Sequence, residues 1–156
     1  MNIFKKSFNI ALKQKIDCIL IETMNDGYET KAAVLAAKES LQENKIDLPI
    51  FVTNVYDSDS RLLSGATPES MVAMLEGMGV DALGANCSLG PKQLTPIIEE
   101  ILENASIPVI LQPNAGLPLM EEGKMKYDIT SDEFAYMLQF RHGEEKRHPE
   151  IGIGSY

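Results

Sequence analysis

Four short apolar segments recur along the chain, and each stops abruptly at polar or turn-forming residues. They are Asp17–Glu22, Pro49–Val55, Asp81–Asn86 and Ile107–Gln112. Their residues form nearly continuous apolar runs, often β-branched, rather than an alternation with polar residues. Such runs are typical of strands that are covered on both faces. The pattern therefore predicts four strands of a parallel sheet.

The segments between these runs have the pattern of amphipathic helices. Glu29–Asn44 is rich in alanine, leucine and lysine, with apolar residues at helical spacing. A second helix is predicted from Thr67, a cap residue followed by proline, a third from Pro91 and a fourth from Ser131. An amphipathic segment, Ile3–Gln14, precedes the first strand. Strands that alternate with helices indicate the α/β class with right-handed crossovers.

Two architectures fit this alternation of strands and helices. A closed (β/α)8 barrel takes roughly 250 residues, so four units would be half of one. An open doubly wound sheet of four or five strands is the alternative. The turn Glu22–Gly27 lacks a glycine-rich phosphate-binding fingerprint, which makes a nucleotide-binding sheet the weaker choice. Pro113–Thr130 is predicted to be an irregular loop over the site at the strand ends.

Composition and charge narrow the function classes. The 156 residues suffice for one domain with a real core, and the hydrophobic content of 44% is ordinary for a globular protein. A net charge of −9 argues against nucleic acid as a partner. No apolar run approaches the ~18 residues of a membrane span, and the N-terminus does not resemble a signal peptide. We therefore expect a cytoplasmic protein whose two cysteines are thiols.

Cys87 is the first candidate for chemistry, because it directly follows the third predicted strand. A lone cysteine is usually a small buried hydrophobe. Its place at a strand end, beside Asn86 and before a helix, favours a ligand or a nucleophile instead. Cys87 and Asn114 follow neighbouring strands, and a cysteine and an asparagine at such strand ends are plausible ligands for a soft metal such as zinc. Cys18, inside the first apolar run, is predicted to belong to the core.

Five further polar residues are candidates for a role in a site or in a turn. Glu22 closes the first strand and either caps the next helix or binds a cationic group of a ligand. Asn114 lies between prolines and is either a turn residue or a polar group held in place by a stiff loop. Asp26 is interpreted as a cap or turn former. His142 and His148 lie in a polar tail and are interpreted as solvated.

Four motifs, in this order, resemble the homocysteine S-methyltransferase domain: IETMND, RLLSG, DALGANCSLGP and QPNAGLP. That domain is the zinc- and homocysteine-binding barrel of cobalamin-dependent methionine synthase and of betaine–homocysteine methyltransferase. The resemblance runs from about Ile16 to Phe140. It implies parallel β/α units forming part, about strands 4–7, of a TIM-type (β/α)8 barrel. Residues 1–140 would be this partial barrel, and residues 141–156 a divergent polar tail.

The resemblance also implies an activity and roles for three residues. The family transfers a methyl group to the homocysteine thiol and so makes methionine, with the help of zinc. By resemblance, Cys87 is the first of three cysteine ligands of the metal, and Asn114 matches an asparagine that approaches the metal when substrate is absent. Glu22 matches an acid that binds the homocysteine amino group. The methyl donor is corrin-bound, a sulfonium or of the betaine type; cobalamin would reach the site through a partner domain or protein.

The chain departs from the family pattern at several places. The Gly-Gly-Cys-Cys-Gly motif that supplies the other two cysteines is absent, as is the early Asp-Gly-Ala motif, and the residues after Phe140 are polar and turn-rich. We therefore expect a fragment that is truncated or altered in reading frame at both ends and that binds zinc weakly or not at all.

Two function classes stay open for such a fragment. One is a methyltransferase that is complete only with the missing parts. The other is a non-catalytic half barrel, a binding or assembly module that dimerises through exposed strand edges at Cys18–Ile21 and Val109–Leu111. An open half barrel would also expose Ile21, Val52 and Leu83 on one face or the other.

Overall fold

The computed structural model describes residues 2–116, 119–121, 124–127, 129–139 and 151–153. Within them, five strands form one parallel sheet in the order β1-β2-β3-β4-β7. These strands are β1 (Ile19–Met24), β2 (Ile50–Asn54), β3 (Ala82–Asn86), β4 (Val109–Gln112) and β7 (Ile151–Ile153). The four predicted strands are confirmed, and so is their parallel arrangement.

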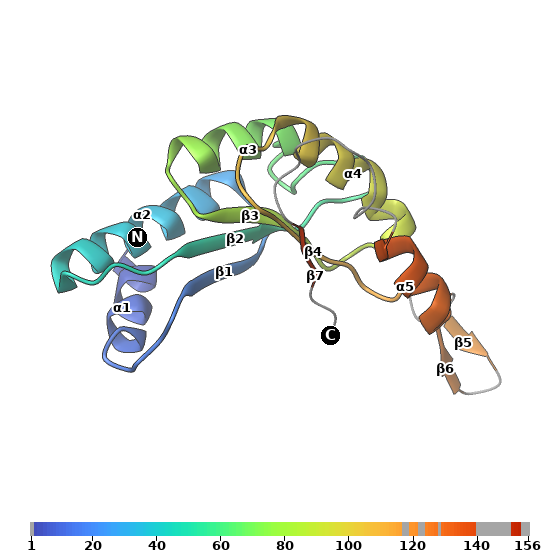
Figure 1. The fold of residues 1–156 in the computed structure, drawn as a ribbon, viewed down its shortest axis with the longest axis horizontal. Helices are drawn as coiled ribbons and strands as arrows, with labels where there is room; N and C mark the ends of the chain where they lie inside the picture. The colour runs from blue at the N-terminus through green and yellow to red at the C-terminus, as the bar shows by residue number, and fades with distance from the viewer. Residues whose placement is uncertain (1, 117–118, 122–123, 128, 140–150, 154–156) are drawn as a thin grey trace.

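Five helices accompany the sheet in the part of the chain that is described. They are α1 (Asn2–Ala11), α2 (Gly27–Asn44), α3 (Pro68–Gly77), α4 (Pro91–Asn104) and α5 (Ser131–Gln139). Figure 1 shows α2, α3 and α4 arched over one face of the sheet, with α1 beside α2. None of the described helices combines the length and the apolar character needed to cross a membrane.

The helix starts follow from local side-chain chemistry, as the sequence predicts. The side chain of Asp26 accepts a hydrogen bond from the Glu29 N–H at 2.8 Å and caps α2. Thr67 and Ser70 form a reciprocal capping box before α3, and Pro91 takes the first position of α4. Each arrangement satisfies or removes backbone donors that the first helical turn leaves without partners.

One row of the sheet forms the centre of the core. Ile21 pairs with Val52, Val52 with Leu83, and Leu83 with Val109, so the row crosses four strands. All four side chains are buried and belong to the cluster that contains Ile98 and other residues of α3 and α4. The expectation that Ile21, Val52 and Leu83 would be exposed is therefore wrong, because the helix layer covers this face.

The opposite face of the sheet is covered less completely. The side chain of Leu20 is 45% exposed, and its register partner Phe51 is half-buried.

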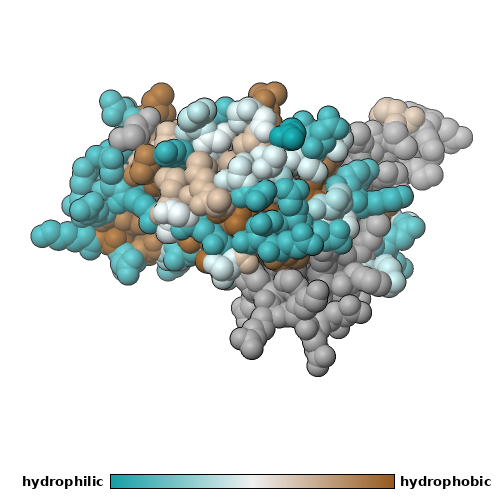
Figure 2. Space-filling model, turned by 90° about the horizontal axis from the view of Figure 1, so that it is seen from above, coloured by the Kyte–Doolittle hydropathy of each residue, from teal (hydrophilic) through white to brown (hydrophobic). Residues whose placement is uncertain are grey.

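Figure 2 shows the molecule from above the helices, where hydrophilic residues cover much of the described surface and hydrophobic ones are scattered among them. The outer faces of the helices are thus solvated, as expected for amphipathic helices that bury one side.

Three expectations need correction. Pro113–Thr130 contains a short antiparallel pair, β5 (Leu119–Glu121) and β6 (Lys124–Lys126), and is not irregular throughout. Cys18 is exposed, because it precedes β1 instead of lying inside it. Val109–Leu111 is no edge, since β4 pairs with β7 along this segment. The sequence gives little signal for β7 because its three residues are interrupted by glycine.

Candidate functional site

The polar residues of the sheet gather at its carboxyl edge. All five strands run parallel, so their carboxyl ends meet at the same side of the sheet. Side chains alternate between the two faces, which places Glu22, Thr53, Asn86 and Gln112 on the face opposite the core row. One polar residue from each of four adjacent strands therefore faces the side that is the interior of a closed barrel.

Asn86 and Thr23 connect the ends of β3 and β1. The Asn86 side chain is 1% exposed. Its Oδ1 accepts a hydrogen bond from the Thr23 N–H at 3.1 Å, and its Nδ2 donates to the Thr23 Oγ1 at 2.7 Å. Because Thr23 follows Glu22 and Asn86 precedes Cys87, the two hydrogen bonds tie together the backbone segments that carry both candidate residues.

Cys87 lies at the turn predicted for it and is half-buried. Its φ is 59° and that of Ser88 is 53°, so two successive non-glycine residues adopt the left-handed conformation. The Cys87 N–H donates to the Gln112 carbonyl oxygen at 3.0 Å, and its own carbonyl oxygen accepts from the Leu89 N–H at 2.7 Å. The turn that presents the thiol is thus fixed to the end of β4.

The loop after β2 is held by the same turn. The Ser88 Oγ donates to the Tyr56 carbonyl oxygen at 2.7 Å. The Tyr56 side chain is 2% exposed. Burial, and to a smaller extent the nearby Glu100 carboxylate, raises the pKa of the Tyr56 phenol well above its ordinary value, so the phenol stays neutral. Tyr56 therefore acts as a neutral buried anchor beside the site.

Asn114 lies next to the Cys87 turn. Its N–H donates to the Leu89 carbonyl oxygen at 3.0 Å, while its side chain is exposed. Glu22 is half-buried near the end of β1. Hydrogen bonds thus connect the turn that carries Cys87 with the backbone of Asn114, and the Asn86–Thr23 pair connects it with the strand that carries Glu22. Asp26, by contrast, is a helix cap, as predicted.

The described residues do not fit a complete zinc site. Among them, no group of three histidine, cysteine, aspartate or glutamate residues is close enough to hold a metal ion. Cys87 supplies one thiol, whereas zinc sites in proteins use at least three protein ligands. Cys18 precedes β1 and so lies at the opposite end of the strands. His142 and His148 fall outside the described residues.

The structure draws attention to two residues that the sequence did not single out. The Thr53 Oγ1 and the Gln112 Oε1 are buried without a hydrogen-bond partner among the residues described. Both face the same side of the sheet as Asn86 and Glu22. The available signal was a polar residue near the end of an otherwise apolar strand: Thr53 is the second-last residue of β2, and Gln112 is the last residue of β4. Buried polar atoms without partners are rare in native structures, and a binding or catalytic role is one of the explanations for them.

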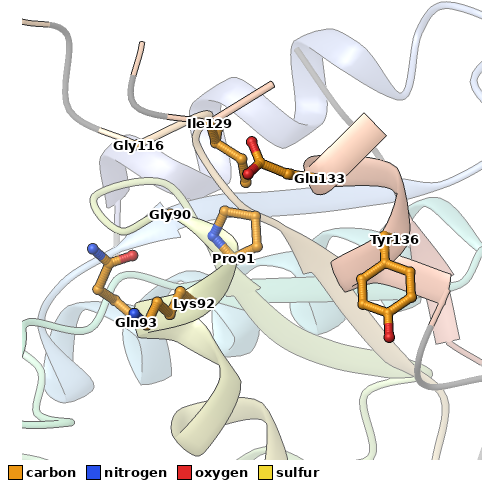
Figure 3. Close-up of a pocket in the computed structure, with 8 residues that line it drawn as sticks. All are labelled: Gly90, Pro91, Lys92, Gln93, Gly116, Ile129, Glu133 and Tyr136. Atoms are coloured by element: carbon orange, nitrogen blue, oxygen red, sulfur yellow. The ribbon is translucent and has the colours of Figure 1, made fainter. Parts of the chain in front are cut away.

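A separate cavity of about 420 Å3 lies between the start of α4 and α5. Figure 3 shows residues that line it, with Glu133 and Tyr136 on α5 and Pro91 and Gln93 on α4. The Glu133 carboxylate accepts hydrogen bonds from the N–H and the Oγ1 of Thr130, which lower the pKa of Glu133 from its ordinary value. The cavity borders the loop after Cys87 but shares no lining residue with the strand-end cluster.

Parallel β/α units with polar side chains gathered at the carboxyl edge are the arrangement in which α/β enzymes place their active sites. Residues 1–150 match the family model "Homocysteine S-methyltransferase", and the chain belongs to this family, which confirms the resemblance. It is 33% identical over 122 residues to the methionine synthase of Mycobacterium leprae and 32% identical to that of Mycobacterium tuberculosis. Each match covers 78% of this chain but 10% of the relative.

The fold is similar to solved homocysteine methyltransferases. The apo form of MmuM from Escherichia coli has a TM-score of 0.62 at 18% identity, covering 97% of this chain and 51% of that one. The metallated form has a TM-score of 0.61 and is covered to 46%. The chain therefore spans about half the length of these solved relatives and a tenth of the curated ones.

Proposed function

We propose that this chain forms about strands 4–7 of a homocysteine S-methyltransferase barrel, which methylates the homocysteine thiol to give methionine. The supporting observation is the strand-end cluster: Glu22, Cys87 and Asn114 lie on backbone segments that hydrogen bonds connect at one edge of the sheet. In this proposal residues 1–140 derive from the barrel. Residues 141–156 form a tail that diverges from the family motifs, although the family match reaches residue 150, and its Ile151–Ile153 extends the sheet.

The proposed roles follow from the chemistry of the side chains. The Glu22 carboxylate would bind the ammonium group of homocysteine, and the Asn114 amide would lie beside the sulfur. In the transfer, the deprotonated sulfur bonds to the methyl carbon while the bond from that carbon to the donor breaks, leaving its electrons on the donor. Zinc, a cofactor of the proposed reaction, would need ligands in addition to Cys87. A corrin-bound donor would require a corrinoid-binding partner.

A non-catalytic half barrel that acts in binding or assembly is the second candidate. Two observations favour it. The described residues contain no group of three metal ligands. Among the described residues, strand β1 ends the sheet on one side, and its Leu20 is 45% exposed. A pairing surface of this kind suits a protein that associates through its strands.

Calorimetric titration with homocysteine tests the first proposal. We expect weak binding by the wild type and at least tenfold weaker binding by Glu22→Gln, because the variant lacks the charge that would pair with the ammonium group. Glu103→Gln is the matched control, since it makes the same change at an exposed position of α4. Equal affinities of wild type and Glu22→Gln would reject the role of Glu22. A folded wild type without any homocysteine binding would favour the assembly module.

A further inference from the structure

We propose that Asn86 and Thr23 are positioning residues whose paired hydrogen bonds set the separation between the Glu22 carboxylate and the Cys87 thiol. The proposal rests on the proposed function of these two groups. Asn86 and Thr23 are 63 residues apart in sequence, and each is the immediate neighbour of a candidate site residue. Neither is a candidate for contact with substrate in its own right; both act through the residue next to them.

The hydrogen bonds reach across an intervening strand. Strand β2 lies between β1 and β3 in the sheet, so Asn86 bonds to a strand that is not its neighbour. The regular pairing of β1 with β2 is interrupted between Ile21 and Met24. Thr23 lies in this irregularity, and its N–H turns to the Asn86 side chain instead of following the ladder. A local break in the sheet is thus what makes the contact possible.

Thr23 is held in a conformation that a β-branched residue rarely adopts. Its φ is 63°, in the left-handed region, where steric repulsion disfavours threonine more than most residues. Such conformations persist only where surrounding interactions determine them, and they are common at functional sites. Two hydrogen bonds hold Thr23 there: its N–H donates to the Asn86 Oδ1, and its Oγ1 accepts from the Asn86 Nδ2.

The choice of partner argues against a purely structural role for Asn86. Its register partner on the adjacent strand is Gln112, whose Oε1 is buried without a hydrogen-bond partner among the described residues. If the buried Asn86 amide needed only a hydrogen-bond partner, the Gln112 side chain on the adjacent strand is a polar group that could serve. Asn86 instead bonds to the more distant Thr23, and this contact fixes the Glu22 strand relative to Cys87.

The Cys87 side of the link is equally constrained. Cys87 and Ser88 both have positive φ, and hydrogen bonds fix them to Gln112 and Tyr56. With the Asn86 contact, the turn is tied to β1, to the loop after β2 and to β4. Groups that act on one substrate need to be held within a fraction of an ångström, and buried hydrogen bonds of neighbouring residues are the usual means.

Amide hydrogen exchange measured by NMR tests the link without any substrate. Thr23→Val removes the hydroxyl that accepts from Asn86, and we expect exchange of the Cys87 amide to accelerate at least tenfold. Thr23→Ser keeps the hydroxyl and should stay within twofold of the wild type. Thr53→Val is the matched control, because Thr53 is fully buried on the neighbouring strand and its Oγ1 has no partner in the described residues.

The Leu83 amide, which donates to Pro108 within the sheet, reports on general loss of stability. A purely structural role would accelerate Leu83 and Cys87 in parallel, and that result would overturn the proposal. Equal Cys87 exchange in Thr23→Val and Thr53→Val would do the same. Should Thr23→Val not fold, Thr23→Gly replaces it, since glycine tolerates the positive φ while the hydroxyl is still lost. In Thr23→Gly we expect the same acceleration of amide exchange at Cys87, without acceleration at Leu83.

Homocysteine affinity gives the second readout. We expect binding to weaken at least tenfold in Thr23→Val and to be restored by Thr23→Ser, which keeps the hydroxyl that accepts from Asn86. Unchanged affinity in Thr23→Val, in a wild type that binds, would contradict the positioning role. A wild type that does not bind homocysteine contradicts the proposed function instead, and the exchange comparison then decides the positioning role by itself.

Discussion

The candidate site is built from residues whose backbone conformations are unusual for their type. Thr23, Cys87 and Ser88 all have positive φ, although none is glycine. Each is held by a hydrogen bond with a residue distant in sequence. Thr23 bonds with Asn86, Cys87 with Gln112, and Ser88 with Tyr56. At the scale of single residues, the carboxyl edge of the sheet is therefore a place where tertiary contacts determine the local conformation.

Metal binding is the property of Cys87 that is simplest to measure. We expect tag-free protein to retain far less than stoichiometric zinc after mild chelation, because a single thiol falls short of the three protein ligands that zinc sites use. Elemental analysis of the purified protein checks this, with Cys18→Ser as the control for the exposed thiol. Stoichiometric zinc that is lost on Cys87→Ser would contradict the expectation and would point to ligands outside the described residues.

At the scale of secondary-structure elements, the contact between β3 and β4 depends on Gly84. A Cβ added to Gly84 would overlap the carbonyl oxygen of Ile110 and lie 2.8 Å from the Ile110 nitrogen. Both strands are paired along this stretch and flanked by core residues, so neither backbone is free to move away. The absence of a side chain is what allows β3 to lie between β2 and β4 here.

Gly84→Ala is expected to destabilise the protein by about 2–3 kcal/mol, because the methyl group meets backbone atoms in a packed interior. Urea unfolding measures the change in the free energy of unfolding. Gly77→Ala provides the matched control: Gly77 ends α3, and a Cβ there would meet no atom within 4 Å. The control should be neutral or stabilising by about 0.5 kcal/mol. Equal stabilities of the two variants would refute the close approach of β3 and β4.

At the scale of the whole molecule, β1 forms one edge of the sheet in the described part of the chain. There the order β1-β2-β3-β4-β7 leaves β1 with one neighbour, and Asp17 and Cys18, directly before it, are exposed. The face with Leu20 and Phe51 is covered less than the helix side. An edge strand that carries apolar residues and no charge along Ile19–Ile21 is a template for pairing with another chain.

We therefore predict self-association, with a homodimer that pairs β1 edges as its simplest form. Sedimentation equilibrium at micromolar concentration measures the state, and Leu20→Lys should shift it toward the monomer by placing a charge beside the edge. Leu63→Lys, at a leucine that is 85% exposed in the loop after β2, is the control and should leave the association unchanged. A wild type that stays monomeric and unfolds sharply would show that this edge needs no partner.

The sequence by itself determined the features that depend on neighbours in the chain. The four strands between Ile19 and Gln112 follow from continuous apolar runs, and the helix starts follow from caps three residues away, as with Asp26 and Glu29. The motifs around Asn86–Cys87 and Asn114 identified the family. All of these signals lie within short windows, and the interactions behind them act over one or two helical turns or a single strand.

The tertiary structure alone decided which distant segments meet. Ile151–Ile153 pairs with β4, whose outer edge offers backbone hydrogen bonds. The sequence gives little signal for this strand, because its three residues are interrupted by glycine. Asn86 bonds to Thr23 because the pairing of β1 with β2 breaks at that level. Cys18 is exposed and precedes β1, which begins at Ile19, two residues after the start of the predicted strand at Asp17. Register, edges and side-chain partners arise from the packing of the whole sheet, and local propensity does not encode them.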